Sequence, residues 1–470
     1  MSNLDFLDTN QLNHKYNKCK NNTRLMTTDL KRYFKETFFT SFDRTVSLTT
    51  FHQRPDRFRM LEDKQEILQI ARGGGFSFSP ASFGKNVLVK EMLSFNRILE
   101  FIESSKIVIV EAGITLAKLL EWSYKKRLFF PVQPGWPRIT VGGCIAASAH
   151  GKNPHKDGTF VDHVEWIELF HPTFGRKIVS RSNEAKIFEA TCGGLGLTGI
   201  ITKVALRLRD LPSNSLIIMP RKAETLEDAL RIMKDNANQD ILYSWHIGST
   251  LLNFGKGIVR IGSFSEKNNS DKLFLPKIKN LSSDNKLPPF ALWNNLSSSI
   301  INTINRKVEV VKGDIEKDLF SGLFPFKDKA NIFYTLYGSK GFNESQILIN
   351  ENQSNEFLMD LTKLIHAEKP SLTLLFMKLF KGERKYLRFS GNGLSVTLNL
   401  KHCSSTLRFL EKLDNLIISY KSIPHIIKDS RLSKNVVEQC FPGYYDFKEI
   451  LKQIDPKRIY KSEVSKRLDL

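Results

Sequence analysis

Hydrophobic residues along the first half of the chain alternate between strand-like and helix-like spacing. Runs such as ILQIA and KIVIVEAG have the apolar, β-branched composition of strands, and LAKLLEWSYKK repeats its apolar residues at helical spacing. Thr115 directly precedes the helical run and is suited to be its N-cap. This pattern extends from about residue 64 to about residue 212. It predicts a first folded unit that mixes strands with helices.

The second half predicts mostly antiparallel strands joined by helices. Four segments resemble strands and two resemble helices: KGIVRIGSF, ESQILI, SLTLLFMKLF and GLSVTLNL, then NEFLMDLTKLIHAE and TLRFLEKLDNLIISYK. Residues 265–300 are rich in Asn, Ser, Lys and Pro, which predicts a long loop overhanging a site. Residues 1–44 are polar and basic and predict an N-terminal arm. The whole pattern favours a two-domain α+β fold.

Charge and cysteine usage narrow the class of partner. Lys and Arg number 70 against 49 Asp and Glu, a formal net charge of +21, which suits an anionic partner such as a phosphate, a nucleic acid or a membrane surface. No apolar run reaches the length of a membrane span, and the polar start lacks the apolar core of a secretory signal, so we expect a cytoplasmic protein. The five cysteines are widely spaced without a CxxC pair, which predicts neither a disulfide framework nor a metal site.

Two glycine-bearing segments are candidates for holding a nucleotide. ARGGGFSFS follows a strand-like run, and its glycines would let backbone N–H groups converge on a pyrophosphate; a tight loop is the alternative. Residues 142–151, GGCIAASAHG, are small at almost every position, so the backbone can approach a flat ligand. A buried core explains such a run poorly, and close packing of a helix on a sheet is the alternative that remains. It would not require His150, which is a candidate catalytic group here.

A third segment contains a formal GxGxxG motif from Gly194 to Gly199. A dinucleotide fingerprint runs from strand to glycines to helix. Here the helix-like SNEAKIFEATC comes first and the strand-like IITKVALRL comes last. The sequence therefore argues against an NAD(P)-binding Rossmann unit.

Together these segments resemble the FAD-binding domain of the vanillyl-alcohol oxidase and p-cresol methylhydroxylase (PCMH) superfamily. The likeness is greatest to the branch whose members oxidise decaprenylphosphoryl-β-D-ribose at C2. The segments that carry it occur in the same order: ITVGGCIAASAHGKNPHKDGTF with His163, GGLGLTGII, MKLF around Lys378, KDSR from Lys428 to Arg431, and DPKRIYKSEVSKRLDL. Residues from about 215 to 320 match poorly.

The resemblance implies an FAD-binding PCMH-type domain over residues 45–213, completed by residues 423–470, and a substrate-binding domain over 214–422. Phe76 stands where tethering relatives have a histidine, so the implied FAD is non-covalent. The implied cofactor contacts are Arg72, Gly73, Gly74, Gly75, Phe76, Ser77, Phe78, Gly135, Thr140, Val141, Gly142, Gly143, Ala147, Ser148, Ala149, His150, Ile200, Ile201 and His425.

The same resemblance implies catalytic roles for Lys428 and His150. Lysine suits proton transfer when desolvation lowers its pKa. The implied substrate contacts are Lys378, Gln346, Glu344, Ser395 and Phe324. Three positions depart from the family pattern, because Ser395 replaces a reactive cysteine, His425 a tyrosine and Glu344 a glutamine. These departures affect the identity of the lipid and the sugar rather than the flavin chemistry.

The implied function is FAD-dependent oxidation of the C2 hydroxyl of a polyprenyl-phosphate-linked pentose, with hydride transfer to flavin N5. A separate short-chain reductase would take the keto product and complete an epimerisation for cell-wall polysaccharide synthesis. A lipid-linked substrate implies peripheral contact with a membrane. The first alternative is an aldonolactone or sugar-alcohol oxidase acting on a soluble substrate. A nucleic-acid-binding protein is disfavoured because no recognised nucleic-acid-binding module appears in the sequence. An inactive flavoprotein subunit is disfavoured because Lys428 and His150 are retained.

Overall fold

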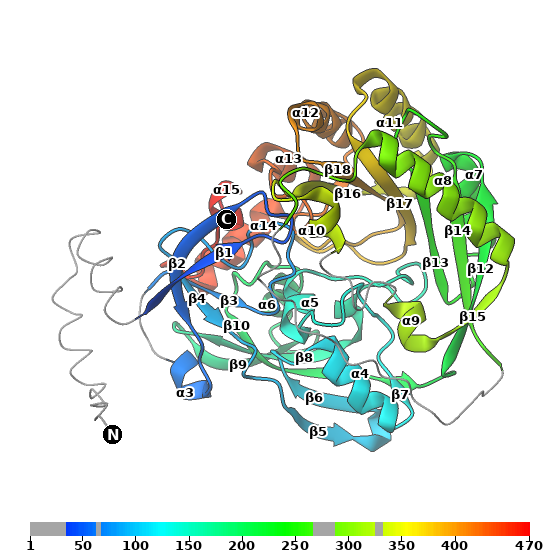
Figure 1. Cartoon of the computed structure of the whole chain (residues 1–470). Helices are drawn as coiled ribbons and strands as arrows, with labels where there is room; N and C mark the ends of the chain where they lie inside the picture. Colours follow the sequence, from blue (N-terminus) through cyan, green and yellow to red (C-terminus); the bar gives the residue numbers. More distant parts are fainter. Residues whose placement is uncertain (1–33, 63–66, 267–286, 325–331) are drawn as a thin grey trace, which may run out of the picture.

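The structure, a computed structural model, describes residues 34–62, 67–266, 287–324 and 332–470. Its helices and mostly antiparallel sheets confirm the α+β class. Figure 1 shows a first part built from two smaller sheets and a second part built around one large sheet. Within the described residues, no helix has both the length and the apolar character needed to span a membrane.

The first part carries a four-stranded sheet of order β1-β2-β4-β3 and a five-stranded antiparallel sheet of order β5-β6-β10-β8-β9. The strands are β1 (Lys35–Thr40), β2 (Ser47–Gln53), β3 (Gln69–Arg72), β4 (Leu88–Glu91), β5 (Ile98–Ile102), β6 (Ile107–Glu111), β8 (Val164–His171), β9 (Gly175–Ser180) and β10 (Ile200–Arg207), with a small pair formed by β7 (Leu128–Phe129) and β11 (Arg209–Asp210). The helices are α3 (Phe58–Leu61), α4 (Leu116–Lys125), α5 (Val141–Ala146) and α6 (Ala185–Thr191), with 3-10 turns at Glu103–Ser105 and Phe160–His163.

Local signals in this part agree with the sequence. Thr115 caps α4 by accepting a hydrogen bond from the backbone N–H of Lys118 at 3.3 Å, and α4 buries Leu116 and Leu119. The GxGxxG segment lies between α6 and β10. The order of helix, glycines and strand is therefore confirmed, and it is the reverse of the Rossmann order.

The second part is an eight-stranded antiparallel sheet of order β15-β12-β14-β13-β17-β18-β16-β19. Its strands are β12 (Ser215–Ala223), β13 (Ile241–Ile247), β14 (Gly257–Phe264), β15 (Ile315–Asp318), β16 (Phe342–Asn350), β17 (Leu372–Phe380), β18 (Gly393–Lys401) and β19 (Ile423–Pro424). Its helices are α7 (Leu226–Asp235), α8 (Asn295–Lys312), α9 (Leu319–Leu323), α10 (Ile332–Tyr337), α11 (Ser354–Glu368) and α12 (Ser404–Ser419), with a 3-10 turn at Glu351–Gln353.

The two faces of the large sheet have different neighbours. Leu242 on β13 belongs to the hydrophobic core under α7, α11 and α12. The next residue, Tyr243, points to the opposite face because side chains alternate along a strand. Tyr243 and Trp245 line a cavity there, together with residues of α8. The large sheet therefore has a packed face and a face that forms part of a site.

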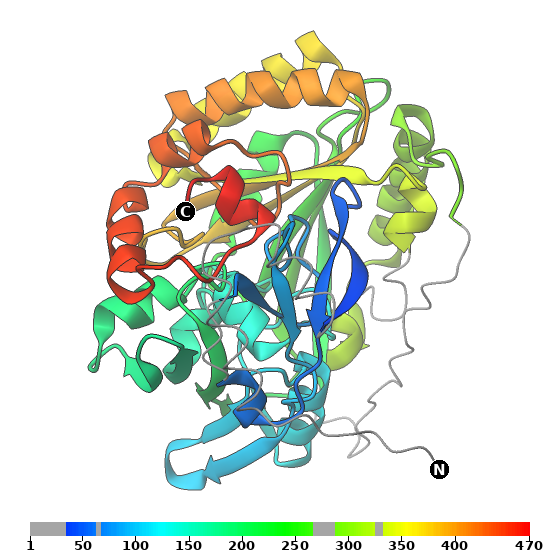
Figure 2. The same ribbon diagram turned by 90° about the vertical axis from the view of Figure 1, so that its left-hand side faces the viewer.

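The C-terminal segment returns to the first sheet. It contains α13 (Lys434–Cys440), α14 (Tyr444–Ile454) and α15 (Glu463–Arg467). Gln69 of β3 donates its backbone N–H to Ile459 at 2.9 Å and accepts from Lys461 at 3.1 Å. The backbone N–H of Glu463, at the start of α15, donates to the Phe83 carbonyl at 2.9 Å, and Figure 2 shows α15, the red helix beside the C label, near the first sheet. The predicted domain boundaries remain predictions, but residues 423–470 do contact the first part.

Two predicted segments end earlier than expected. Residues 1–33 of the predicted arm lie outside the described residues, whereas residues 35–40 form β1 and pair with β2. Residues 267–286 of the predicted loop also lie outside the described residues. From Asn295 onward the loop prediction is wrong, because α8 begins there. Asn294 caps α8, its side chain accepting from the N–H groups of Leu296 at 3.0 Å and Ser297 at 3.1 Å.

Candidate functional site

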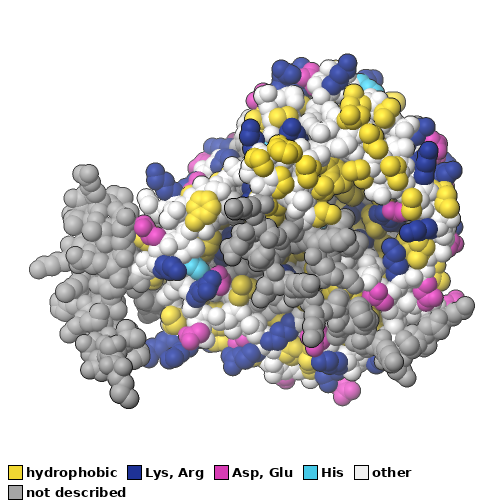
Figure 3. All heavy atoms as spheres, in the orientation of Figure 1, with side chains coloured by type: hydrophobic (Ala, Val, Ile, Leu, Met, Phe, Trp, Pro, Cys, Tyr) yellow, Lys and Arg dark blue, Asp and Glu magenta, His cyan; other side chains and the backbone are white. Residues whose placement is uncertain are grey.

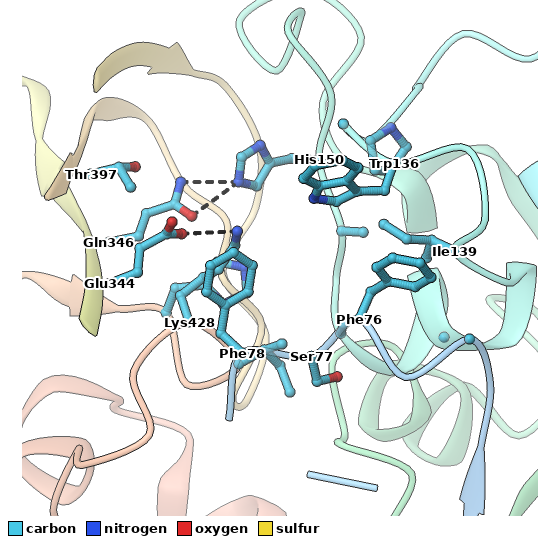
Figure 4. A pocket seen from close by; sticks show the side chains of 18 of the residues that line it. Phe76, Ser77, Phe78, Trp136, Ile139, His150, Glu344, Gln346, Thr397 and Lys428 are labelled. Carbon is cyan, nitrogen blue, oxygen red and sulfur yellow. Dashed lines mark hydrogen bonds and ion pairs between the residues drawn. The ribbon is translucent and has the colours of Figure 1, made fainter. Parts of the chain in front are cut away.

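A cavity of about 860 Å³ lies between the loops of the first part and the open face of the large sheet. Figure 4 shows residues of the two walls facing each other. Phe76, Ser77 and Trp136 come from the first part, and Glu344 and Gln346 come from β16. Segments far apart in the sequence therefore meet at one site.

The first glycine loop follows β3 and leaves no room for side chains. A Cβ added to Gly73 would overlap the Thr140 hydroxyl, and one added to Gly74 would lie 2.6 Å from the Arg138 carbonyl oxygen. Gly75 has a φ of +75°, in the region where glycine is favoured. The loop thus presents bare backbone to the cavity, which suits binding of a pyrophosphate through backbone N–H groups.

The second loop leads into α5 and is also built from small residues. Thr140 caps α5, accepting a hydrogen bond from the Gly143 N–H at 3.2 Å. A Cβ at Gly142 would lie 3.1 Å from the Cβ of Ala112, so this helix packs closely on its neighbour. Close helix packing, the alternative explanation of these small residues, is therefore real here. The same segment also lines the cavity through Gly142, Gly143, Ala146, Ala147, Ala149 and His150.

His150 connects the two walls. Its Nε2 lies 3.0 Å from the amide nitrogen and 3.3 Å from the amide oxygen of Gln346, and its Nδ1 lies 3.3 Å from the Gly151 carbonyl oxygen. Burial, reinforced by Lys378, His425 and Lys428, holds the pKa of His150 well below its usual value. The ring is therefore neutral at pH 7, with one nitrogen able to donate a hydrogen bond and the other able to accept one.

Lys428 lies in an ion pair. Its Nζ lies 2.9 Å from Glu344 Oε1 and 3.8 Å above the centre of the Phe78 ring. The second oxygen of Glu344 accepts a hydrogen bond from Asn399 Nδ2 at 2.6 Å. The carboxylate is thus fixed at both oxygens, and it holds the Lys428 ammonium group against the wall of the cavity.

Two other lysines are half-buried and lie beside backbone carbonyls rather than carboxylates. Lys378 Nζ donates to the Gly151 carbonyl at 2.9 Å and lies 3.4 Å from His150 Nδ1, and Lys152 donates to the Leu323 carbonyl. Burial, then the charge of Lys428, lowers the pKa of Lys378 to about 7. Burial, then the charges of Lys378 and Arg260, lowers the pKa of Lys152 to about 7. Such cations gain most from an anion that enters the cavity.

The charge of the cavity is positive. The described residues that line it include five basic side chains, Lys152, Arg260, Lys317, Lys378 and Lys428, and two acidic ones, Glu309 and Glu344. Glu344 pairs with Lys428, and Glu309 pairs with Arg260. The arrangement suits a ligand that carries a phosphate.

All but six of the residues predicted to form the site line the cavity. Ser395 is buried and accepts a hydrogen bond from Gln346 Nε2 at 3.0 Å. Phe324 is fully buried in a separate hydrophobic cluster with Phe129 and Phe320. The predicted residues that do not line the cavity are Arg72, Val141, Ser148, Ile200, Ser395 and Phe324.

The site also contains residues that the sequence analysis did not select. Lys152 follows the small-residue segment directly, and a basic residue beside a predicted ligand loop was a usable signal. Tyr243, Trp245 and Arg260 lie on β13 and β14, in the region that matched the family poorly. No local signal in the sequence showed that their face of the sheet is open.

Comparison with known proteins agrees with this geometry. Residues 61–173 match the FAD binding domain family. Decaprenylphosphoryl-β-D-ribose oxidase of Mycolicibacterium smegmatis is 25% identical over 409 residues, covering 85% of this chain and 89% of that protein. L-gulonolactone oxidase 2 of Arabidopsis thaliana is 22% identical, covering 75% of this chain and 68% of that protein. D-lactate dehydrogenase of Anaerostipes hadrus is 27% identical over 36% of each chain.

The matched range contains both glycine-bearing loops, and the cavity beside them has the bare backbone that a dinucleotide needs. These findings confirm the PCMH-type fold and FAD as the cofactor. The residues that would hold FAD are those of the two loops that line the cavity: Gly73–Phe78, then Thr140, Gly142, Gly143, Ala146, Ala147, Ala149 and His150. That the FAD is bound without a covalent bond stays a prediction.

Proposed function

We propose that this FAD-dependent oxidoreductase oxidises the C2 hydroxyl of a pentose carried on a polyprenyl phosphate, giving the keto sugar. The observation that carries the proposal is the pair of half-buried lysines, Lys152 and Lys378, in the cavity that the FAD loops line. The phosphate of such a substrate is esterified to both the lipid and the sugar, and its single negative charge would lie beside these two lysines. The likeness to a decaprenylphosphoryl-β-D-ribose oxidase supports the same substrate class.

FAD held by the two glycine-bearing loops would serve as the oxidant, since flavins can accept a hydride from a carbinol carbon. The protein must bind the sugar, orient its hydroxyl and accept the hydroxyl proton. His150 is neutral and lies at the junction of the two walls, so one of its ring nitrogens serves as proton acceptor. The Lys428 ammonium, fixed by Glu344, donates a hydrogen bond to the oxygen of the reacting hydroxyl.

The phosphate contacts have a separate task. Lys378 and Lys152 bind the anion, and the negative charge raises their pKa values again, so both bind it as ammonium groups. A phosphate beside His150 also offsets the repulsion between protonated His150 and Lys378. The keto product would then pass to a separate short-chain reductase. Reduction of the C2 ketone from the opposite face would give the C2 epimer of the starting pentose.

Product analysis tests this function. The purified holoprotein, incubated with a detergent-solubilised polyprenyl phosphoryl pentose and an artificial electron acceptor, should yield a product that has lost two hydrogens and that hydrazine reagents trap at C2. Lys428→Met should retain FAD and form little product. Absence of the keto sugar with a fully FAD-loaded protein would refute the proposal.

The second candidate is oxidation of a soluble aldonolactone, which the likeness to L-gulonolactone oxidase 2 favours. Such a substrate carries no phosphate, so Lys378 and Lys152 would have no anionic partner in it. An assay in parallel with free aldoses and aldonolactones separates the candidates. Turnover of a lactone without turnover of the phosphoryl pentose would put the second candidate first.

A further inference from the structure

Helix α8 has the reverse of the usual polarity. Its polar residues Ser298, Ser299 and Asn302 are buried, with exposed fractions of 0%, 0% and 3%. Five of its seven apolar residues lie on the outer side, exposed by 43% to 86%, and form what we call the α8 stripe: Leu296, Ile300, Ile304, Val308 and Val311. A helix that covers a sheet normally buries its apolar face. The inversion therefore needs a physical explanation.

Hydrogen bonds attach α8 to the sheet without apolar packing. Asn302 Nδ2 donates to the Thr373 carbonyl on β17 at 3.1 Å. Arg306 donates to the Gly257 carbonyl on β14 at 3.1 Å and to Glu224 at 2.6 Å. Because these bonds position the helix, its apolar face is not needed to hold it, and the stripe is left for another partner.

The same helix forms part of the cavity. Ile301, Asn302, Asn305 and Glu309 line it from α8. Leu374, Phe376 and Lys378 follow one another on one face of β17, since side chains alternate along a strand. Apolar side chains therefore lead from the phosphate-binding lysine Lys378 toward the underside of α8. A lipid chain attached to the phosphate would find an apolar surface in that direction.

Basic side chains surround the stripe. Lys307 and Lys312 on α8 and Lys222 on β12 are exposed, and Phe290 and Leu292, exposed by 64% and 45%, extend the apolar surface before the helix begins. Figure 3 shows hydrophobic side chains gathered over the face that carries α8, with Lys and Arg around them. Apolar residues flanked by cations fit an anionic bilayer. A second copy of this chain, also at +21, would bring like charges together.

We propose that the α8 stripe docks on an anionic lipid surface and thereby places the cavity at the bilayer, where a lipid-linked sugar resides. The choice of lipid as partner rests in part on the proposed function. The docking itself does not require substrate, so the two proposals are tested separately.

The test is co-sedimentation of the FAD-loaded full chain with vesicles of pure phosphatidylglycerol or pure phosphatidylcholine. The variant Ile300→Glu/Ile304→Glu adds two charges at stripe positions that do not line the cavity. Its matched control, Leu99→Glu/Ile178→Glu, changes two apolar residues of similar exposure on β5 and β9, the edge strands of the five-stranded sheet. Absorbance of bound FAD and the melting temperature check that both variants fold.

We expect binding to phosphatidylglycerol that weakens with salt, falls at least about tenfold in the stripe variant and persists in the control. Three results would overturn the docking proposal: no binding of the wild type to either vesicle, equal loss in both variants, or a wild-type dimer that the stripe variant dissociates. Both variants should oxidise a water-soluble, short-chain phosphoryl pentose at the wild-type rate. Failure of that oxidation in every protein, with vesicle binding intact, would count against the proposed function instead.

Discussion

The two walls of the cavity are built from different materials. The loop wall presents backbone and small side chains, and a Cβ at Gly73 or Gly74 would collide with its neighbours. The wall from β16 and β17 presents long polar side chains, among them Glu344, Gln346 and Lys378. The first wall selects a ligand by closeness of approach, and the second by charge and hydrogen bonding. Added volume should therefore damage the first wall, and loss of charge the second.

The largest effect is expected where the walls meet, at His150. His150→Phe keeps an aromatic ring beside Phe380, whose centre is 5.0 Å from that of the histidine, but removes the proposed proton acceptor. We expect the rate of flavin reduction by substrate to fall roughly 100- to 10,000-fold, with FAD retained. Stopped-flow absorbance under anaerobic conditions measures this rate.

The control for this change is His425→Phe. His425 also lines the cavity, and its ring stacks on Phe389 with centres 4.4 Å apart. Phenylalanine preserves that stacking, so the rate should stay within a few-fold of wild type. A normal rate in His150→Phe would remove His150 from the mechanism.

Next comes added volume in the loop wall. Gly74→Val would push a side chain against the Arg138 carbonyl, 2.6 Å from the position of the new Cβ. Such overpacking raises the free energy of the native loop conformation by about 3 kcal/mol. Because FAD binding requires that conformation, the affinity for FAD should fall roughly a hundredfold. Titration of the apoprotein with FAD, followed by fluorescence, measures the loss.

Gly248→Val is the matched control, because a Cβ there would also lie 2.6 Å from its neighbour, Leu372 Cγ, although this glycine does not line the cavity. It should bind FAD as the wild type does. Equal affinity in both variants would show that the first glycine loop does not hold the cofactor.

Loss of charge in the second wall should have a smaller effect. Lys378→Met and Lys152→Met remove one cation each while keeping most of the side-chain volume. A hydrogen bond to a charged group contributes about 1.5 to 3 kcal/mol, so kcat/KM for the phosphoryl pentose should fall roughly ten- to a hundredfold. The same variants should retain FAD. Unchanged kinetics in both would show that the phosphate binds elsewhere.

The smallest expected effect is on pH dependence. The pKa values of Lys378 and Lys152 are lowered to about 7 in the free protein, so both ammonium groups are present below pH 7 and are lost as the pH rises above it. Affinity for the phosphate should therefore weaken from pH 6 to pH 8, by less than about tenfold for each lysine. Lys378→Arg keeps its charge across this range. Its KM should vary less with pH than the KM of the wild type, and an equal slope would contradict the assignment.

The sequence predicted the loop wall better than the wall formed by the large sheet, because only local interactions leave a recognisable pattern in the sequence. The loop wall was predictable because runs of glycine and alanine can be read directly from the sequence. Such runs allow the backbone to come close to a ligand. Thr115 and the helix that follows it were predictable for a similar reason, since capping is a local interaction. Interactions within a few residues along the chain leave a pattern in the sequence.

The second wall was less predictable because the pairing of distant strands assembles it. Arg260 and Trp245 come from β14 and β13, and only the register of the large sheet places them beside Lys378. Helix α8 was missed from Asn295 onward because its segment resembled a polar loop and its apolar residues do not face a core. Phe324, inferred from resemblance alone, packs in a separate cluster. Tertiary context decides such positions.

The most direct test of the account is an anaerobic titration of the purified holoprotein, followed through the visible flavin bands. A polyprenyl phosphoryl pentose should bleach the bands, and the same pentose without its phosphate should leave them nearly unchanged. That result would show that the flavin oxidises the sugar only when the substrate also carries the phosphate, as expected if the cavity binds both the flavin and the phosphate. An FAD-loaded protein that stays yellow with the phosphoryl pentose, or bleaches equally with both sugars, would contradict it.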